Sequence, residues 1–388
     1  MPASTRFHTA RVLVLSVGHA IHDAYPAFLA PLVPLLKHKL GLSNALAGTL
    51  ATFLRSSSLV QPFIGYLADR MSARWFVVLA PGATAVCMSL LGAMPGYGLL
   101  VPLLLLAGLS HACYHAPAPA MVAQVSGERI GAGMSFFMTG GELGRAAGPL
   151  LIVAAVQWFG LETSYLAAIP GLLASLVMAG LVGPVPVPKA PGDAAALRAI
   201  LRDRRRPLAL LLAFVWTRAA MIGSITVFTP AYLTTRGMSL AGAAAGYGLL
   251  ELAGAAGAMA AGTLSDRLGR RGTLVLFQAA VVPCFYALVA GPESLIGPLL
   301  ALTGFLAFAV TPVALALLQE LLPEARSTAS GLYFSLNYIM TGLAAVLFGV
   351  LADRLGLQAA FGWLAVVPLC TLPFALLLPG RFAPAPRE

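Results

Sequence analysis

Apolar segments of membrane-spanning length alternate with short polar loops along the whole chain of 388 residues. A transmembrane helix needs about 20 consecutive apolar residues to cross the hydrocarbon core of a bilayer. About twelve segments meet this requirement, at residues 11–36, 44–68, 75–94, 98–124, 130–158, 163–183, 208–234, 240–264, 273–291, 295–321, 327–351 and 359–378. The pattern predicts an all-α polytopic membrane protein with twelve transmembrane helices.

A polar stretch at residues 184–207 divides the apolar segments into two sets of six. Within it, residues 194–201 have helical character, and we expect this segment to lie along the membrane surface near anionic lipid headgroups. The predicted organisation is therefore an N-terminal six-helix bundle at residues 1–183, a cytoplasmic linker at 184–207 and a C-terminal six-helix bundle at 208–388.

Composition agrees with this pattern and excludes a soluble domain. The chain is 59% hydrophobic and only 10% charged, with a mean hydropathy of +0.88, whereas a soluble fold needs far more charge to cover its surface. The net charge of +10 does not indicate nucleic-acid binding, because the basic residues cluster in short stretches between apolar segments. The four cysteines lie in apolar segments without paired spacing, so neither a disulfide framework nor a zinc module is indicated. We expect no cofactor and no metal.

The basic residues also predict the orientation. If the N-terminus is inside, the outer loops hold only Lys37, Lys39, Arg236 and Arg354, and the inner side carries the excess. By the positive-inside rule both termini are cytoplasmic. We expect a multi-pass protein of the inner (cytoplasmic) membrane that functions as a monomer, with the lipid bilayer, protons and a small-molecule substrate as its partners.

A cytoplasmic loop is repeated in the two halves of the chain. Gly65-Tyr-Leu-Ala-Asp-Arg-Met-Ser-Ala-Arg74 follows the second apolar segment, and Gly262-Thr-Leu-Ser-Asp-Arg-Leu-Gly-Arg-Arg271 follows the eighth. Duplication of a six-helix unit leaves such a repeat. The loop is similar to the Gly-x-Leu-x-Asp-Arg-x-Gly-Arg-Arg signature of the major facilitator superfamily. This resemblance, which covers essentially the whole chain, implies the major facilitator fold and a transport function.

The repeated loop also predicts a conformational latch. A carboxylate at a helix end can pair with nearby Arg side chains and with the N-terminus of a neighbouring helix. The alternative is that these residues only end helices and set the topology. The predicted latch residues are Gly65, Asp69, Arg70 and Arg74 in the first copy and Gly262, Asp266, Arg267 and Arg270 in the second.

The fifth apolar segment contains a run of small residues, Gly144-x-x-x-Gly148-Pro149. Small residues at this spacing let helix backbones approach closely, and proline removes a backbone donor and bends a helix. The run resembles the Gly-x-x-x-Gly-Pro core of a motif associated in the superfamily with exporters that exchange substrate for protons. Gly144, Gly148 and Pro149 are therefore predicted to form either a generic close helix contact or an exporter-specific hinge.

Ionisable side chains within the apolar segments indicate candidate functional positions, because charge is costly inside a membrane. Three pairs have a spacing of three or four residues, which places both members on one helical face: His19 with Asp23, His111 with His115, and Glu142 with Arg145. On the fold implied by the resemblance, these groups could converge near the bilayer midplane. For Glu142 and Arg145, a self-neutralising ion pair is the alternative to a transport role.

Three further charged residues lie in apolar segments. Arg218 and Glu251, on adjacent helices of the second half, could form a structural pair between helices. Arg55 has no obvious local partner, and it could pair with Asp23 or bind an anionic substrate.

A finer resemblance appears in the first apolar segment. Gly18-His-Ala-Ile-His-Asp-Ala-Tyr25, with the Phe-Leu-x-Pro-Leu-x-Pro-Leu-Leu run at residues 28–36, resembles the opening helix of the fosmidomycin resistance protein branch. Tyr-His-Ala-Pro at residues 114–117 resembles the aromatic-His-Pro element of that branch. The resemblance implies efflux of small drugs coupled to inward proton movement. By position, it implies that His19, Asp23, Tyr25 and His115 belong to the site.

These residues combine into a hypothesis of proton-coupled antiport by alternating access, with no catalytic residues. Asp23 is the first candidate for proton coupling, with His19 beside it and Glu142 second. The candidate substrate-binding residues are Tyr25, Arg55, His111, His115, Arg145, Arg218 and Glu251. His22 is rotated by about 60° from His19 around the helix, so packing is its expected role.

Three other functions stay open. An importer of an organic anion linked to protons is the runner-up among transporters. The four histidines of the apolar segments, with Asp23, lie on two facing helices and could instead bind a transition metal. The protein would then be a carrier of metal ions or metal chelates, or a membrane metalloenzyme. A sensor or scaffold that transports nothing is the third alternative.

Overall fold

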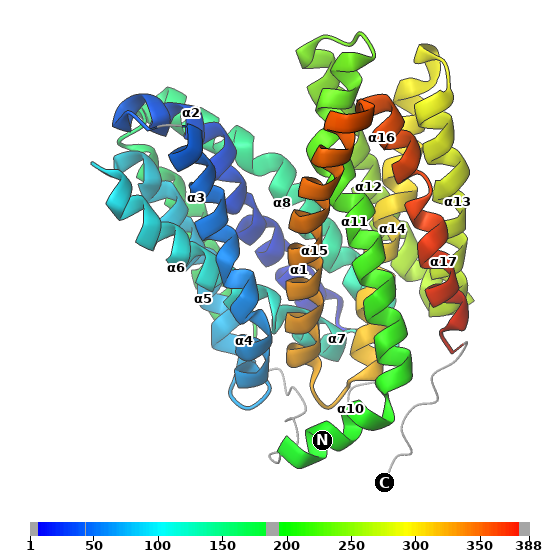
Figure 1. Ribbon diagram of the computed structural model, residues 1–388. Helices are drawn as coiled ribbons and strands as arrows, with labels where there is room; N and C mark the ends of the chain where they lie inside the picture. Colours follow the sequence, from blue (N-terminus) through cyan, green and yellow to red (C-terminus); the bar gives the residue numbers. More distant parts are fainter. Residues whose placement is uncertain (1–6, 43, 184–193, 380–388) are drawn as a thin grey trace. The chain divides into compact units, whose positions relative to one another are not determined.

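The computed structural model describes residues 7–42, 44–183 and 194–379. Within these residues every regular element is an α-helix or a short 3₁₀ helix (Figure 1), as predicted. In chain order they are α1 (Thr9–Ala24), η1 (Pro26–Phe28), α2 (Leu29–Leu40), α3 (Asn44–Ser56), η2 (Ser57–Val60), α4 (Gln61–Ala68), α5 (Ala73–Ser89), η3 (Leu90–Ala93), α6 (Tyr97–His115), α7 (Ala118–Val125), α8 (Ile130–Phe159), η4 (Ser164–Ala168), α9 (Ile169–Leu181), α10 (Ala194–Asp203), α11 (Arg205–Thr235), α12 (Leu240–Leu268), α13 (Arg270–Ala290), η5 (Glu293–Leu295), α14 (Ile296–Leu321), α15 (Arg326–Leu355), α16 (Leu357–Leu364) and α17 (Val367–Leu377).

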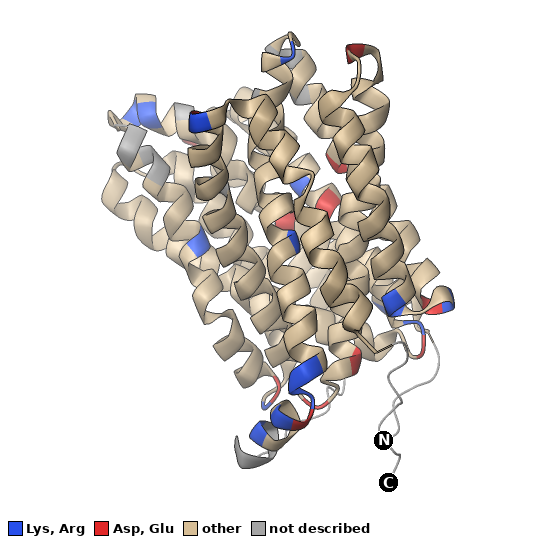
Figure 2. Cartoon of the chain, turned by 45° about the vertical axis from the view of Figure 1, so that its right-hand side comes forward, with Lys and Arg blue, Asp and Glu red and all other residues tan. Residues whose placement is uncertain are grey.

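Nine segments of the described chain are long and apolar enough to cross a membrane. The other three predicted spans, at residues 44–68, 130–158 and 240–264, coincide with α3 to α4, with α8 and with α12. Figure 2 shows Lys and Arg largely near helix ends and in the loops, with few charges along the helices. This distribution is the one expected of helices that cross a bilayer.

Several predicted spans are broken helices rather than continuous ones. Within the predicted span at residues 11–36, α1 ends at Ala24 and the 3₁₀ turn η1 begins at Pro26. In the fourth span, α6 ends at His115, two residues before Pro117. Proline has no backbone N–H and clashes with the preceding turn, so each break lies where the sequence removes a helical hydrogen bond.

The chain forms two compact units that do not follow the midpoint of the sequence. Among the described residues, the first comprises residues 7–42, 44–128, 136–183 and 324–335, and the second comprises residues 129–135, 194–323 and 336–379. In the first unit α5 packs against α6 and α9, and in the second α14 packs against α12 and α13. The domain boundaries after residues 183 and 207 stay a prediction. Residues 184–193 of the predicted linker lie outside the described residues, whereas the helix predicted at 194–201 is present as α10.

Each unit has its own apolar core. Tyr25, Phe28 and Leu104 are fully buried in the first unit, and Tyr232 and Phe285 are fully buried in the second. Between these cores and the lipid, long apolar side chains remain exposed on the helices. In a membrane protein, such exposed apolar side chains contact lipid rather than water.

Glycines bring α8 against α1 within the first unit. A methyl group added at Gly140, Gly144 or Gly148 would collide with the carbonyl oxygen of Ser16, Ala20 or Ala24, respectively. The close helix contact predicted from the sequence is therefore present, and its four-residue register follows one face of each helix. A hinge at Gly144, Gly148 and Pro149 stays a prediction. The contact places the polar residues of α8 beside those of α1.

Candidate functional site

The centre of the candidate site is Asp23, near the C-terminal end of α1, whose side chain is only 2% exposed. His115 Nε2 on α6 donates to Asp23 Oδ1 at 2.9 Å. Arg145 Nη1 on α8 donates to Asp23 Oδ2 at 2.5 Å, and His19 Nε2 lies 3.3 Å from the same oxygen. Three helices that are distant in the sequence therefore meet at one buried carboxylate. The predicted convergence of these groups is present within this unit.

Arg145 joins Asp23 to a second buried carboxylate. Its Nη2 lies 2.5 Å from Glu142 Oε1, so the pair expected from the three-residue spacing is present. The exposed fractions differ sharply: the Arg145 side chain is 42% exposed, whereas Asp23 and Glu142 are 2% and 9% exposed. Glu142 Oε2 is buried and has no hydrogen-bond partner among the described residues. Arg145 is thus the one residue of this ionic group whose side chain is substantially exposed.

His19 is held by α8 as well as by its own helix. Its Nδ1 lies 2.6 Å from the carbonyl oxygen of Phe137, and its ring stacks on the Phe137 ring at 4.0 Å between centroids. A carbonyl oxygen only accepts hydrogen bonds, so Nδ1 carries the proton and Nε2 faces Asp23. Gly141 leaves the space that this ring fills, because a methyl group there would collide with it.

An aromatic stack extends the cluster along α1 and α6. The His22 ring stacks on the Tyr114 ring, with 4.4 Å between centroids, and on the His111 ring, with 5.3 Å between centroids. The centroids of the His111 and His115 rings are 4.0 Å apart. The Tyr114 hydroxyl donates to the carbonyl oxygen of Leu15 at 2.9 Å, which fixes the ring against α1. His22, for which packing was predicted, therefore lies inside the cluster.

Two candidate substrate residues of the first unit are not part of this cluster. The Tyr25 hydroxyl donates to the Ala167 carbonyl oxygen at 3.0 Å, and its ring is buried in the core. Arg55 is exposed on α3, and the described partners of Asp23 are Arg145 and the two histidines. Arg55 is therefore not among the described partners of Asp23.

The candidate residues of the second unit make the following contacts, and the pair expected between Arg218 and Glu251 stays a prediction. Arg218 Nη2 donates to the Ala307 carbonyl oxygen at 2.6 Å and lies 2.9 Å from Thr311 Oγ1. Glu251 Oε1 accepts from the Tyr247 hydroxyl at 2.7 Å. Their role in substrate binding stays a prediction.

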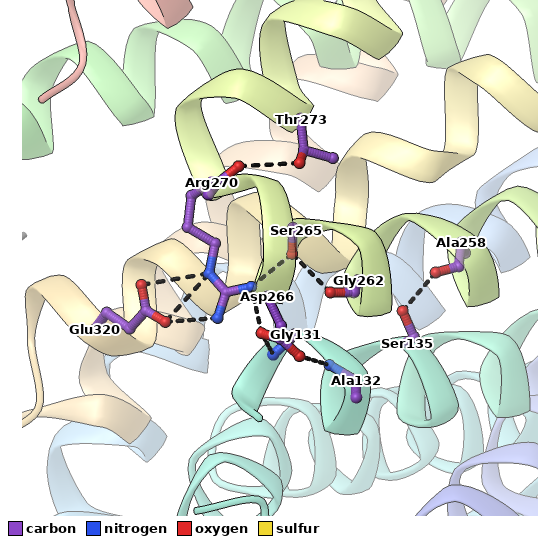
Figure 3. A network of polar contacts seen from close by, with 11 residues as sticks. Gly131, Ala132, Ser135, Ala258, Gly262, Ser265, Asp266, Arg270, Thr273 and Glu320 are labelled. Atoms are coloured by element: carbon purple, nitrogen blue, oxygen red, sulfur yellow. Dashed lines mark hydrogen bonds and ion pairs between the residues drawn. The ribbon is translucent and has the colours of Figure 1, made fainter. Parts of the chain in front are cut away.

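The second copy of the repeated loop forms the polar network of Figure 3. Asp266, near the end of α12, accepts from the backbone N–H groups of Gly131 and Ala132 at 3.0 and 2.8 Å, at the start of α8. Arg270 Nη1 lies 2.7 Å from Asp266 Oδ1, and Arg270 Nη2 lies 2.6 Å from Glu320 Oε1. A carboxylate at the N-terminus of a helix satisfies free N–H groups and complements the helix dipole. The side chain of Arg267, in contrast, is exposed.

The first copy repeats the helix cap without repeating the arginine pair. Asp69 accepts from the N–H groups of Ser327 and Thr328 at 2.9 and 2.8 Å, at the start of α15, and from the Thr328 hydroxyl at 2.7 Å. Arg74, which was predicted to assist Asp69, donates instead to the Ala179 and Val182 carbonyl oxygens. The reason is local: these carbonyls end α9, where a cation is also favoured.

The remaining latch positions have simpler roles. The guanidinium of Arg70 lies 3.5 Å from the centre of the Tyr66 ring. A methyl group at Gly65 would collide with the backbone of Ser327, and one at Gly262 with the Gly131 carbonyl oxygen. Both glycines therefore permit the close approach on which the two aspartate caps depend.

Comparison with known proteins agrees with this geometry. Residues 15–345 match the family model described as Major Facilitator Superfamily. The chain belongs to this superfamily. It is therefore a multi-pass membrane transporter, not an enzyme, and its twelve-helix fold is that of a major facilitator.

Relatives and solved structures of the superfamily resemble this transporter over most of its length. The fosmidomycin resistance protein of Escherichia coli (strain K12) is 25% identical over 362 residues, which is 92% of this chain and 89% of that one. The transporter FucP in its outward conformation has a TM-score of 0.80 at 15% identity and covers 95% of this chain and 98% of its own. The human organic anion transporter MFSD10 (TETRAN) has a TM-score of 0.76 at 17% identity, with 95% and 99% covered.

Sequence reasoning missed two members of the transporter's central cluster, Tyr114 and Phe137. The packing role expected of His22 stays a prediction, and its ring is fully buried and stacked on two neighbouring rings. A four-residue spacing predicts contacts within one helix. Which rings surround His22 depends on where α6 lies relative to α1, and the sequence of α1 does not specify this. A signal was available for Tyr114, which directly precedes His115 in the family-like element. Phe137 contributes its backbone carbonyl as well as its ring, and a side-chain pattern contains no signal for a carbonyl contact.

Proposed function

We propose that this transporter exports a small anionic or zwitterionic compound in exchange for protons, as a monomer in the inner membrane with both termini in the cytoplasm. Resemblance to the fosmidomycin resistance protein and the partial exporter motif on α8 support the direction. The distribution of Lys and Arg supports the orientation. The observation that carries the substrate class is the half-exposed Arg145 between two buried carboxylates.

Arg145 is the proposed anion-binding group. A guanidinium can bind a carboxylate, phosphate or phosphonate through two parallel N–H groups. Asp23 is the positioning residue in this proposal, because it holds one end of the guanidinium while Glu142 holds the other. An incoming anion exchanges with Glu142 rather than with Asp23, since Asp23 is also bonded to His115.

Glu142 is the proposed proton carrier, with Asp23 and His19 as the other predicted coupling residues. Its free Oε2 can bind a proton without breaking a hydrogen bond. Once protonated, Glu142 loses its ion pair with Arg145 and its ability to bind a cationic or donor group of the substrate. A zwitterion whose anionic group binds Arg145 and whose donor group binds Glu142 is therefore released when Glu142 is protonated. Competition of this kind is what antiport requires.

The same geometry supports the runner-up function for a different substrate. An anion without a donor group competes with Glu142 for Arg145, so protonation of Glu142 favours its binding. Proton and anion would then move together, as in a proton-linked importer. The charge distribution of the substrate therefore decides the sign of the coupling.

The two aspartate caps are the proposed latch of the transport cycle. Asp69, from the first half of the sequence, caps α15 of the second half, and Asp266 caps α8 of the first half. Movement of the halves in alternating access requires both caps to open. Each cap consists of a few hydrogen bonds at a helix end, so each can break and re-form.

Transport in proteoliposomes tests the proposal, with fosmidomycin, the compound in the relative's name, as the first probe. An exchanger accumulates the compound when the vesicle lumen is acidic, and a symporter does so when the outside is acidic. We expect accumulation with an acidic lumen. Glu142→Gln cannot ionise, so accumulation by this variant should lose its response to the pH gradient. Equal accumulation by wild type in both gradients would contradict proton coupling.

Variants of Arg145 test the binding role separately. Loss of a charge-assisted hydrogen bond of about 1.5–3 kcal/mol should weaken probe binding by about ten- to a hundredfold in Arg145→Met. Arg145→Lys keeps the charge and should lie between Arg145→Met and wild type. Arg354→Met removes an exposed arginine at the end of α15 and should bind like wild type. Wild-type affinity in folded Arg145→Met would refute the role.

A further inference from the structure

We infer that α1 and α6 form a binding site for one divalent transition-metal ion of the zinc class, with His22, Asp23, His111 and His115 as its ligands. The inference rests on the geometry of this cluster and not on the substrate or direction proposed above. It reverses the expectation from sequence that no metal is bound. It also gives His22 a role other than packing.

Distances within the cluster suit a single ion. One ligand atom from each of the four residues lies within 4.8 Å of all the others. Zinc–nitrogen bonds of about 2.0–2.1 Å place tetrahedral ligand atoms about 3.3 Å apart. Asp23 Oδ1 and His115 Nε2 are already 2.9 Å apart, and a bound ion would displace the proton that now lies between them. Small rotations of the imidazole rings can therefore close the site while α1 and α6 stay in place.

His22 is the residue that most requires a partner. It is fully buried, and neither ring nitrogen makes a hydrogen bond of normal geometry to any described residue. The carbonyl oxygen of Ala80 approaches the ring without completing such a bond. A buried polar group without a partner is destabilising, and coordination would give one nitrogen the partner it lacks.

The donor set selects the class of ion. Three imidazoles and one carboxylate suit Zn²⁺, Co²⁺ and Ni²⁺, whereas Mg²⁺ and Ca²⁺ prefer sites made wholly of oxygen. His19 is not among the ligands, since its Nδ1 is bonded to the Phe137 carbonyl oxygen. Ions of this class can reach a transporter free or inside a chelate, and a chelate can use the site only if it leaves coordination positions open.

The neighbouring arginine does not occupy the proposed coordination position. Arg145 binds Asp23 Oδ2, while Oδ1 accepts from His115 Nε2. Glu142, at 2.5 Å, offsets the charge of Arg145. Asp23 can therefore bridge the guanidinium and the ion through its two oxygens, as carboxylates near metals often hold a second partner.

Metal titration of the full-length protein tests the inference. The protein is purified in detergent through an affinity tag without histidine and stripped with a chelator. We expect one equivalent of Zn²⁺ to bind and to raise the apparent Tm, and Mg²⁺ to do neither. Bound Co²⁺ should show the visible absorption of a tetrahedral site with nitrogen ligands. Absence of both responses in wild type would overturn the inference.

Single substitutions locate the site. His22→Gln and His111→Gln should each weaken Zn²⁺ binding at least tenfold, whereas His38→Gln, at an exposed histidine of α2, should bind like wild type. His111 is only partly buried, so its variant keeps the test usable if His22→Gln does not fold. One-equivalent binding unchanged in folded His111→Gln would overturn the assignment. Comparing free Zn²⁺ with a Zn²⁺ chelate in the same titration distinguishes the two sources.

Discussion

Gly144 offers a direct test of the helix contact on which the central site depends. On α8 it faces the carbonyl oxygen of Ala20 on α1, and a methyl group added there would overlap that oxygen. A backbone carbonyl cannot rotate away as a side-chain end can, so Gly144→Ala must separate the two helices. Glu142 and Arg145 lie on the same stretch of α8, and their separation from Asp23 would increase with it.

The magnitude follows from two opposing effects. Overpacking of a tight contact costs about 1–3 kcal/mol. Replacement of glycine by alanine inside a helix contributes up to about 1 kcal/mol in the opposite direction. Gly248, inside α12, has no neighbouring atom within 4 Å of the added methyl group. Gly248→Ala should therefore show only the stabilisation that comes from replacing glycine by alanine in a helix. The two variants should therefore differ by about 1–3 kcal/mol, with Gly144→Ala the less stable.

Unfolding of both variants in detergent micelles, followed by intrinsic fluorescence, measures this difference. We expect Gly248→Ala at or above wild-type stability and Gly144→Ala below Gly248→Ala by the stated amount. Weaker probe binding should accompany the loss in Gly144→Ala, because Arg145 is displaced. Equal stability of the two alanine variants would show that α1 and α8 do not touch at this register.

Three further variants test other contacts by the same unfolding measurement. Arg270→Met should destabilise by about 1.5–3 kcal/mol, because this largely buried guanidinium loses its charged hydrogen bonds to Asp266 and Glu320 while Asp266 keeps its two backbone donors. Exposed Arg267→Met should stay within about 0.5 kcal/mol of wild type, and similar losses in both variants would contradict the network. Tyr114→Phe should cost about 0.5–1.5 kcal/mol through loss of the hydrogen bond to Leu15, and no loss would mean that this bond contributes nothing.

Much of the fold follows from the sequence because a bilayer imposes a length and a composition on each crossing segment. The breaks at Pro26 and Pro117 coincide with residues that cannot donate a backbone hydrogen bond, although other prolines, such as Pro149 in α8, lie inside continuous helices. Pairs three or four residues apart also needed no tertiary information. The Glu142–Arg145 ion pair and the His19–Asp23 contact both follow from the pitch of a helix.

Tertiary structure decided which of these local pairs share a site. Asp23 meets Arg145 across 122 residues and His115 across 92, and no periodicity within a helix contains that information. Arg74 is another residue whose partner the sequence did not predict. It lies in the repeated loop but donates to carbonyl oxygens at the end of α9. The sequence alone determined that charge is buried in these helices, because hydropathy is a property of the segment. Only the packing of α6 and α8 against α1 determined which charges neutralise one another, because contacts between helices depend on their relative rotation.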